Sequence, residues 1–314
     1  MATISVVIAT FHRPEALEKT IRDLLLQTVL PKQIIVVDNS TTDERRKPKS
    51  FSVTGLVECI YLEATKEGFV NAARNEGLRR VTADYAVLMD DDMSLPRDLL
   101  ENFLAIHEEG WDAVAGMVSE RGVPVPSRPT TGLPFWNLVR HRHGTSRGHT
   151  IAVPSCLVSL RQKMLEEIGF LDEAFVYNYD DYDLGLRIWL GGFTLIQDPR
   201  ANASHLKAPL GGSRKNLLGD ERILNKYTAK YYFIHKHFGR RATRMEFAAD
   251  LISSFANCRQ KHFRVVRDLV IYFKAFRKYR AYGCLARHAE TKREGAGLHA
   301  QAGGRCQRQE GQPV

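Results

Sequence analysis

Three consecutive carboxylates directly follow an apolar segment in the first third of the chain, and this pairing constrains the fold most. Tyr85–Met89 reads Tyr-Ala-Val-Leu-Met, and Asp90, Asp91 and Asp92 come next. A short apolar run of this kind predicts a strand buried on both faces, which belongs to a parallel sheet covered by helices. Ligands of such sheets bind beyond the carboxyl ends of the strands. Because crowded carboxylates repel one another unless a cation lies between them, the sequence predicts a site for a divalent metal and a diphosphate.

The acidic run has two other interpretations. A solvated turn after a strand shows the same residues. A calcium loop of the EF-hand type is excluded, because Leu95 stands where that loop needs glycine and Pro96 follows it. A strand, and not a helix, is also expected before the acidic residues.

Composition indicates a globular protein. The 314 residues are 44% hydrophobic and 26% charged, which is enough to bury a sizeable core. The five cysteines are scattered without metal-ligand spacing, as in a reducing compartment. No apolar run is long enough to span a bilayer, and no signal-peptide pattern follows Met1. We therefore expect a cytoplasmic protein, with peripheral contact at the cytoplasmic membrane face left open.

Positive charge is concentrated toward the C-terminus. The net charge is +9, but residues 214–314 hold 22 Lys and Arg against 8 Asp and Glu, whereas residues 1–213 hold 23 against 28. Helices are expected near 220–238, 241–257 and 260–281, and the last is basic and amphipathic. Such a helix fits an anionic membrane surface, or equally a helix packed on the protein with solvated charges. Residues 285–314 are expected to be disordered because their composition cannot build a core.

Strands and helices alternate along residues 1–210. Strands are expected at Ile4–Ala9, Gln33–Val37, Leu56–Leu62, Tyr85–Met89 and Trp111–Val118, and ordered chain resumes over Ile151–Leu160. Helices are expected from Pro14, over Phe69–Arg80, from Pro96 to about Glu109, over Arg161–Ile168 and over Asp180–Leu190. Phe193–Gln197 and Ala201–His205 are expected as two short extended segments. This alternation predicts an α/β fold with a mostly parallel sheet flanked by helices.

Residues 120–150 interrupt the alternation with four prolines and several glycines. A long segment of this composition is typical of a lid or a disordered loop. It contains His141 and His143, but no Cys or acidic residue lies close by in the sequence. A mobile, solvated loop is therefore expected here in preference to a metal site.

Five motifs occur in an order that closely resembles family 2 glycosyltransferases of the GT-A fold. They are Ser5–Pro14 (SVVIATFHRP), Val36–Ser40 (VVDNS), Asn71–Asn75 (NAARN), Leu88–Asp92 (LMDDD) and Tyr179–Arg187 (YDDYDLGLR), followed by His205. The resemblance covers about residues 3–210. It implies a Rossmann-like GT-A catalytic domain over residues 1–212, to which residues 213–284 add a basic helical extension.

The resemblance also implies a donor site. Asp92 and His205 would hold Mn²⁺ or Mg²⁺, which stabilises the negative charge that grows on a departing nucleoside diphosphate. The nucleotide-sugar would be bound by Thr10, Arg13, Asp38, Asn39, Arg74, Asp90 and Asp91. A carboxylate at position 38 can accept the N–H of a uracil or thymine ring, so UDP is expected first and dTDP next.

Each of three assignments has a structural alternative. His205 could be a hydrogen-bonded structural histidine. Asp38 could cap the helix that follows it. Arg74 could be a solvated residue on a helix surface.

An inverting transfer needs a general base to take the proton of the attacking acceptor hydroxyl. By resemblance this base is the second member of an acidic pair at a helix N-terminus, here Asp181. Asp180 stands where relatives usually have Glu. Asp183 is expected to cap that helix or to pair with Arg187 four residues later.

The implied activity is therefore an inverting, metal-dependent hexosyl transfer to a hydroxyl of a glycan or lipid-linked acceptor in polysaccharide or glycoconjugate synthesis. A sugar-nucleotide nucleotidyltransferase is the alternative enzyme, but it usually has a Gly-rich loop after the first strand, and Ala9–Arg13 contains no Gly. A non-catalytic nucleotide- or nucleic-acid-binding protein is the third possibility. No aromatic-basic RNA-binding signature is present, so no nucleic-acid partner is expected.

Overall fold

The computed structural model describes residues 2–52, 55–65, 69–120, 123–124, 147–175, 178–208, 219–256 and 266–280. The chain divides into two compact units, Met1–Arg222 and Ile223–Val314. The predictions for His141, His143 and the tail 285–314 lie outside the described residues, as does most of the 120–150 loop.

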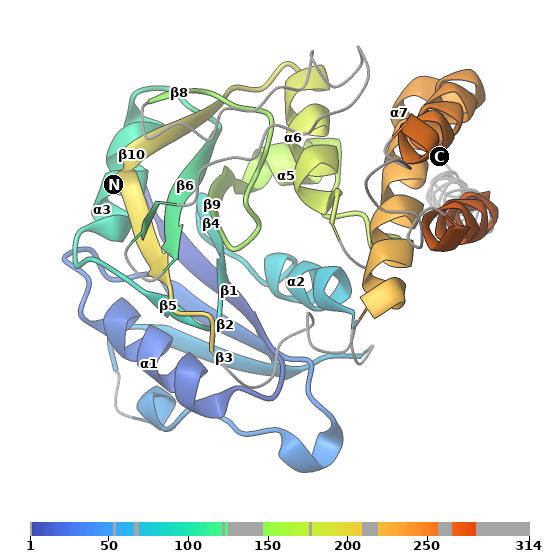
Figure 1. Cartoon of the computed structure of the whole chain (residues 1–314). Helices are drawn as coiled ribbons and strands as arrows, with labels where there is room; N and C mark the ends of the chain where they lie inside the picture. The colour runs from blue at the N-terminus through green and yellow to red at the C-terminus, as the bar shows by residue number, and fades with distance from the viewer. Residues whose placement is uncertain are drawn as a thin grey trace, which may run out of the picture. The chain divides into compact units, whose positions relative to one another are not determined.

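The first unit is built on one mixed sheet of ten described strands, eight of them in the order β3-β2-β1-β4-β9-β6-β10-β5 (Figure 1). Off this path, β7 pairs with β6 and β8 pairs with β10. Four parallel strands form one half, namely β1 (Ile4–Thr10), β2 (Gln33–Asp38), β3 (Glu58–Glu63) and β4 (Tyr85–Asp90). The other half contains β5 (Met93–Ser94), β6 (Ala113–Glu120), β7 (Val123–Pro124), β8 (Gly148–His149), β9 (Leu157–Arg161) and β10 (Leu195–His205). The predicted α/β class with a mostly parallel sheet is confirmed.

Helices cover both faces of this sheet, as the alternation of side chains in β1 shows. Val6 and Ile8 pack in one apolar core with α1 (Pro14–Leu25) and α3 (Leu99–Glu108). Val7 packs in a second core with α2 (Val70–Leu78), α5 (Gln162–Ile168) and α6 (Asp180–Leu190). Since successive side chains of a strand point to opposite faces, α1 and α3 cover one face and the other three helices cover the opposite face.

The helix α1 illustrates how the sequence specifies these elements. Proline at its first position suits a helix start, because its missing N–H would have no partner there. Leu17, Ile21 and Leu24 recur at helical spacing and are all buried. Burying each of these side chains contributes roughly 1.5–3 kcal/mol relative to leaving it exposed.

Several element boundaries differ from the expectation. The helix expected from Pro96 begins at Leu99, and the strand in the ordered segment 151–160 is confined to β9. The two short segments expected at 193–197 and 201–205 are one strand, β10, whose pairing with β6 shifts register between Gln197 and Asn202. In the sequence, the polar residues Asp198 and Arg200 are typical of a loop between two extended segments. In the structure they lie at the register shift within one strand.

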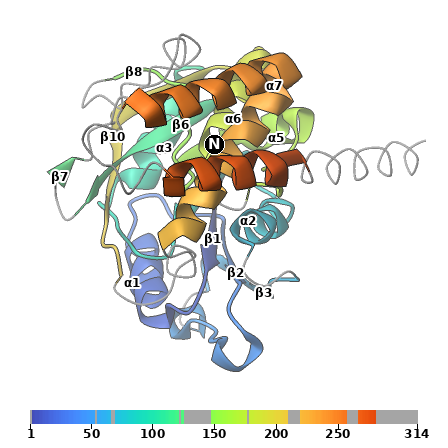
Figure 2. The ribbon, with the colours of Figure 1, turned by 45° about the vertical axis from the view of Figure 1, so that its right-hand side comes forward.

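The described residues of the second unit form helices (Figure 2). Gly239 (φ 81°, ψ −178°) interrupts α7 (Gly219–Ala256), which matches the expected division into helices near 220–238 and 241–257. A further helix covers residues 266–280. The fully buried Tyr231 lies among aromatic rings, including Phe247 at 5.9 Å and Phe276 at 5.8 Å between centroids. Across the described residues, none of the helices combines the length and apolar character needed to cross a membrane.

Candidate active site

The parallel pairing of β1, β2 and β4 gathers polar side chains at one edge of the sheet. Thr10 lies opposite Asp38 in the register of β1 and β2, and Ala9 lies opposite Asp90 in the register of β1 and β4. The three strands therefore end at the same level of the sheet. This edge is where ligands bind in open α/β sheets.

A threonine of α1 fixes the turn that carries the acidic triplet. The buried Thr20 hydroxyl donates to the carbonyl oxygens of Asp91 (2.8 Å) and Met93 (3.0 Å) and accepts from the Met93 N–H (3.1 Å). The chain then enters β5, whose Met93 lies opposite His205 in antiparallel pairing with the end of β10. This pairing brings His205 beside the triplet.

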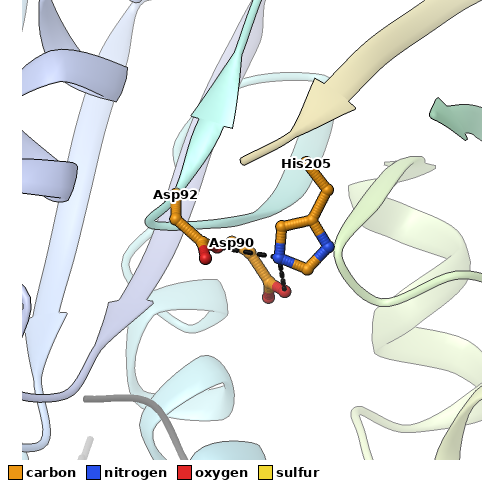
Figure 3. A group of neighbouring side chains, drawn as sticks. All are labelled: Asp90, Asp92 and His205. Carbon is orange, nitrogen blue, oxygen red and sulfur yellow. Dashed lines mark hydrogen bonds and ion pairs between the residues drawn. The ribbon is translucent and has the colours of Figure 1, made fainter. Parts of the chain in front are cut away.

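Asp90, Asp92 and His205 converge on one point (Figure 3). Their ligand atoms all lie within 4.8 Å of one another. His205 Nε2 lies 2.8 Å from Asp92 Oδ1 and 3.8 Å from Asp90 Oδ2. Two carboxylates and one imidazole form a donor set that can hold a divalent cation.

The pKa of Asp92 lies below its usual range although the residue is buried. Burial alone would raise its pKa, but hydrogen bonds from His205 and from the Ala208 backbone N–H, together with the charge of Arg13, outweigh that effect and lower the pKa. The Ala208 N–H lies 2.9 Å from Oδ2, and Arg13 Nη1 also lies 2.9 Å from Oδ2. An ionised carboxylate is the form that can act as a metal ligand.

Asp91 has its own partners on the other side of the turn. Its carboxylate accepts from the Thr10 hydroxyl at 2.7 Å and from Arg13 Nη1 at 3.0 Å. Burial raises the pKa of Asp91 to about 6, against the opposing effects of Arg13 and Thr10. Thr10 and Arg13 thus contact the acidic triplet, and their contact with a nucleoside stays a prediction.

Asp38 is buried and hydrogen-bonded at the end of β2. It accepts from the Ser40 N–H at 3.0 Å and from the Tyr61 hydroxyl at 2.6 Å. The helix that follows is the short 3₁₀ segment η1 (Thr42–Glu44), which begins after Thr41, so the alternative that Asp38 caps it is wrong. Asn39 lies beside it, with its N–H bonded to the Thr10 carbonyl at 2.9 Å. Binding of a pyrimidine ring at this corner stays a prediction.

The acidic pair lies in the first turn of α6, as expected. Asn178 (φ 60°) and Tyr179 (φ 66°) precede it in the left-handed region, a conformation that costs energy for residues other than glycine. The Ser155 N–H donates to Asp181 Oδ1 at 3.1 Å. Burial, and then the neighbouring charge of Asp180, raise the pKa of Asp181 to about 7. Burial likewise raises the pKa of Asp180, with Arg74 opposing it.

Arg74 is buried, so the alternative of a solvated side chain is wrong. Only 6% of the residue is exposed. Its Nη2 donates to Asp90 Oδ1 at 3.0 Å, and its Nη1 donates to the Ser155 hydroxyl oxygen at 2.9 Å. The sequence predicts neither the contact of Thr20 with the acidic turn nor the contact of Ser155 with Arg74. The sequence near each contains no pattern that indicates a polar contact more than 70 residues away.

Two features hold α6 in place. Asp183 pairs with Arg187 four residues later at 2.9 Å, as expected, and Arg187 also donates to the carbonyl oxygens of Ile168, Gly169 and Phe170 at the end of α5. Gly185 lies against the backbone of Ile151, where an added Cβ would be only 1.6 Å from the carbonyl oxygen. A residue without a side chain is therefore required at this contact.

The chain matches the model of glycosyl transferase family 2 over residues 5–169. It is 26% identical over 221 residues to the O-antigen biosynthesis protein RfbC of Myxococcus xanthus, an alignment that covers 64% of this chain and 17% of RfbC. The fold resembles that of the mannosyltransferase PcManGT from Pyrobaculum calidifontis, solved with GDP-Man and Mn²⁺. Here the TM-score is 0.54 with 17% identity, over 88% of this chain and 87% of the other.

A second solved structure, GalNAc-T7 with UDP, GalNAc and Mn²⁺, has a TM-score of 0.55 with 14% identity, over 74% of this chain and 50% of the other. Both likenesses are to glycosyltransferases and concern the fold. The chain belongs to glycosyl transferase family 2 and has the GT-A fold. It spans less than a fifth of the length of RfbC.

Proposed function

We propose that the protein is an inverting, metal-dependent hexosyltransferase that moves a sugar from a nucleotide-sugar to an acceptor hydroxyl. The observation that carries the proposal is that one compact unit contains both a cluster of possible metal ligands, Asp90, Asp92 and His205, and an acidic pair, Asp180 and Asp181, with raised pKa values. A nucleotide-sugar transferase needs both, because one stabilises the departing diphosphate and the other accepts the acceptor's proton.

Asp90, Asp92 and His205 would hold Mn²⁺ or Mg²⁺. Carboxylates suit both cations, and imidazole is a common ligand of transition metals. When bound, the ion would neutralise charge on the diphosphate leaving group. The low pKa of Asp92 supports this assignment, since a ligand carboxylate must be ionised.

Asp181 is the proposed general base. Its raised pKa places the ionisation near neutral pH, where a base is both unprotonated and strong enough to take a proton. Ser155 orients the carboxylate through its backbone N–H. The positive φ angles of Asn178 and Tyr179 set the direction in which the chain enters α6, whose first turn carries the acidic pair.

The donor is proposed to carry UDP, with dTDP next. Asp38 at the end of β2 supports a pyrimidine base, and Thr10, Arg13, Asn39 and Arg74 lie around the same strand ends or on α2. The acceptor is proposed to be a glycan or a lipid-linked hydroxyl. RfbC, named for O-antigen biosynthesis, supports that class of product.

A cytoplasmic location with contact at an anionic membrane surface is proposed from the basic C-terminal region. Exposed basic side chains occur on α7 and on the helix 266–280. Nucleic acid is not proposed as a partner.

A donor screen tests the function. Purified protein would be incubated with UDP-, dTDP- and GDP-sugars, with and without EDTA, and the product's anomeric configuration would be read by NMR. We expect one nucleotide class to be used, activity to be lost in EDTA and restored by Mn²⁺ or Mg²⁺, and the anomeric configuration to be inverted.

A matched pair of variants separates the metal site from general charge effects. Asp92→Asn keeps the side chain's size and should lose Mn²⁺ binding, measured by calorimetry, together with transfer. Glu166→Gln removes an exposed carboxylate from α5 and should match the wild type. Full activity of the wild type in EDTA, with an active Asp92→Asn variant, would contradict the metal assignment.

A further inference from the structure

Arg74 links elements that are distant in the sequence. Its partners are Asp90 at the end of β4, Ser155 in the segment before β9, and Asp180 at the start of α6. A buried guanidinium is costly unless it is paired, so these contacts fix where the side chain lies. A residue with partners on both sides of the proposed site can coordinate their positions.

The two terminal nitrogens of Arg74 divide between the two halves of the site. Nη2 donates to Asp90 Oδ1 at 3.0 Å, while Nη1 donates to the Ser155 hydroxyl at 2.9 Å and lies 3.7 Å from Asp180 Oδ2. Ser155 in turn bonds Asp181, with its N–H 3.1 Å from Oδ1 and a further bond through its hydroxyl. A continuous chain of contacts therefore runs from Asp90 to Asp181.

The geometry of this side chain makes the link stiff. A guanidinium is planar and holds its donors at fixed angles, unlike the single ammonium of lysine. The Arg74 Nε finds no hydrogen-bond partner among the described residues, so the two Nη groups make the connection. Movement of Asp90 would thus be passed to Ser155 and to the acidic pair.

We propose that Arg74 is a positioning residue that, through Ser155, holds Asp181 in fixed register with Asp90, so that the donor half and the base half of the site work as one unit. The inference rests on the proposed function, in which Asp181 takes the acceptor's proton. It gives Arg74 a role beyond the binding of the nucleotide-sugar that the family resemblance implies.

The charges around Asp181 give this link a measurable consequence. Burial and the charge of Asp180 raise the pKa of Asp181, whereas the bonds from Ser155 and the charge of Arg74 lower it. Tyr182, the next residue of α6, has a pKa raised by burial and by the charge of Asp181. Burial lowers the pKa of Arg74, but the charges of Asp90, Asp180, Asp181 and Cys156 raise it, and the pKa is raised as a result. Arg74 is therefore a cation that favours the ionised form of Asp181.

The test compares Arg74→Gln and Arg74→Lys with Arg79→Gln. Arg79 lies at the C-terminal end of the same helix, with 44% of its side chain exposed, and pairs with Glu173 at 3.7 Å. The pH profile of kcat/KM would be recorded for each protein. The pKa of Asp181 would also be measured directly by ¹³C carboxyl NMR without donor, with Asp181→Asn identifying the resonance.

In Arg74→Gln we expect the acidic limb and the NMR pKa of Asp181 to move up together by roughly one unit or more, because a neighbouring cation is lost. In Arg74→Lys the limb should stay near the wild type while kcat falls, since one ammonium cannot span both partners. Arg79→Gln should match the wild type in every measurement.

A uniform loss of rate in Arg74→Gln, with the NMR pKa of Asp181 unchanged, would overturn the proposal. If that variant does not fold, Ser155→Ala decides, since it breaks the chain of contacts without changing charge. It should raise the pKa of Asp181 and leave nucleotide affinity unchanged, and an unshifted pKa would overturn the link. If the wild type transfers no sugar, the proposed function fails, while the NMR measurement still decides whether Arg74 and Asp181 are coupled.

Discussion

The environment of Asp181 suits the role of general base that is proposed for it. Burial disfavours the charged carboxylate, and the charge of Asp180 disfavours it further, so the pKa rises to about 7. Bonds from Ser155 and the charge of Arg74 limit the rise. The result is a carboxylate that is ionised above neutral pH and protonated below it. A general base with this pKa produces an acidic limb in the pH profile.

Replacing Asp181 by Asn keeps its size and removes its ability to accept a proton. We expect a loss of transfer of about 10²- to 10⁴-fold, the usual contribution of positioned base catalysis. Nucleotide affinity should be unchanged by calorimetry, because the proton comes from the acceptor. Asp90→Asn should instead weaken nucleotide binding and turnover together. A near wild-type rate for Asp181→Asn would remove this residue from the mechanism.

The same raised pKa predicts how stability depends on pH. An unfolded Asp titrates near 3.9, so between pH 4 and 7 the folded state holds a proton at Asp181 that the unfolded state has lost. Stability therefore falls through this range relative to a residue that does not titrate. Asp181→Asn should have a higher Tm than the wild type at pH 8, and the difference should shrink toward pH 4.

Asp84 supplies a control of opposite sign. Hydrogen bonds from Thr3 lower its pKa, so its stabilisation is present above the unfolded pKa and is lost as pH falls through the folded value. Asp84→Asn should thus lower the Tm at neutral pH and have less effect in acid. A Tm difference of either variant that does not change with pH would contradict the shift assigned to that residue.

Elements with a strong apolar pattern could be predicted from the sequence. Gln33–Asp38 and Tyr85–Asp90 are strands because their apolar side chains are buried on both faces, and α6 begins and ends where the carboxylates and Gly191 predict. The acidic triplet at the end of β4 was predicted for the same reason. Its position follows from the end of a buried strand.

The contacts that complete the site could not be predicted in the same way. The pairing of Met93 with His205 involves a strand of two residues, too short for any pattern. The position of His205 near the triplet was expected only through a family resemblance. Arg74 lies on a helix whose small residues pack against the sheet, and nothing in the local sequence indicates that its guanidinium is buried against Asp90 and Ser155. Polar contacts between residues that are far apart in the chain leave no repeating pattern in the sequence.

The position of α6 depends on Gly185. Replacing it by Ala would place a Cβ 1.6 Å from the Ile151 carbonyl oxygen, so the helix or the 151–155 segment must move. We expect a destabilisation of about 1–3 kcal/mol, typical of overpacking, and a fall in kcat larger than the change in nucleotide affinity, because Asp181 and Ser155 lie on the two displaced segments. Gly55→Ala is the control, since nothing lies within 4 Å of its added Cβ. Unchanged kcat and unchanged Tm in Gly185→Ala would contradict this account of the contact.

Across the whole molecule, charge is separated along the chain. Residues 214–314 carry a large excess of Lys and Arg, whereas residues 1–213 have a small excess of acidic residues. Within the second unit, the second half of α7 has two exposed apolar residues, Met245 and Ile252, and two exposed basic residues, Arg241 and Arg244. The helix 266–280 likewise exposes Val266 and Val270 together with basic residues. Exposed apolar side chains beside basic ones suit an interface with anionic lipid headgroups.

This arrangement predicts salt-dependent binding of the full chain to anionic liposomes. Replacing Arg241 and Arg244 by Gln should weaken binding at low salt, at about 1 kcal/mol for each charge near the surface, and the difference should shrink as salt screens the attraction. Met245→Ser with Ile252→Ser should weaken binding at every salt concentration, since insertion of apolar side chains is not screened. Lys163→Gln with Arg80→Gln removes two exposed charges from the first unit and should have little effect. Co-sedimentation with vesicles of anionic and of neutral lipid measures each case. If the wild type ignores anionic vesicles at low salt, the basic helices have another role, and their charges are simply solvated.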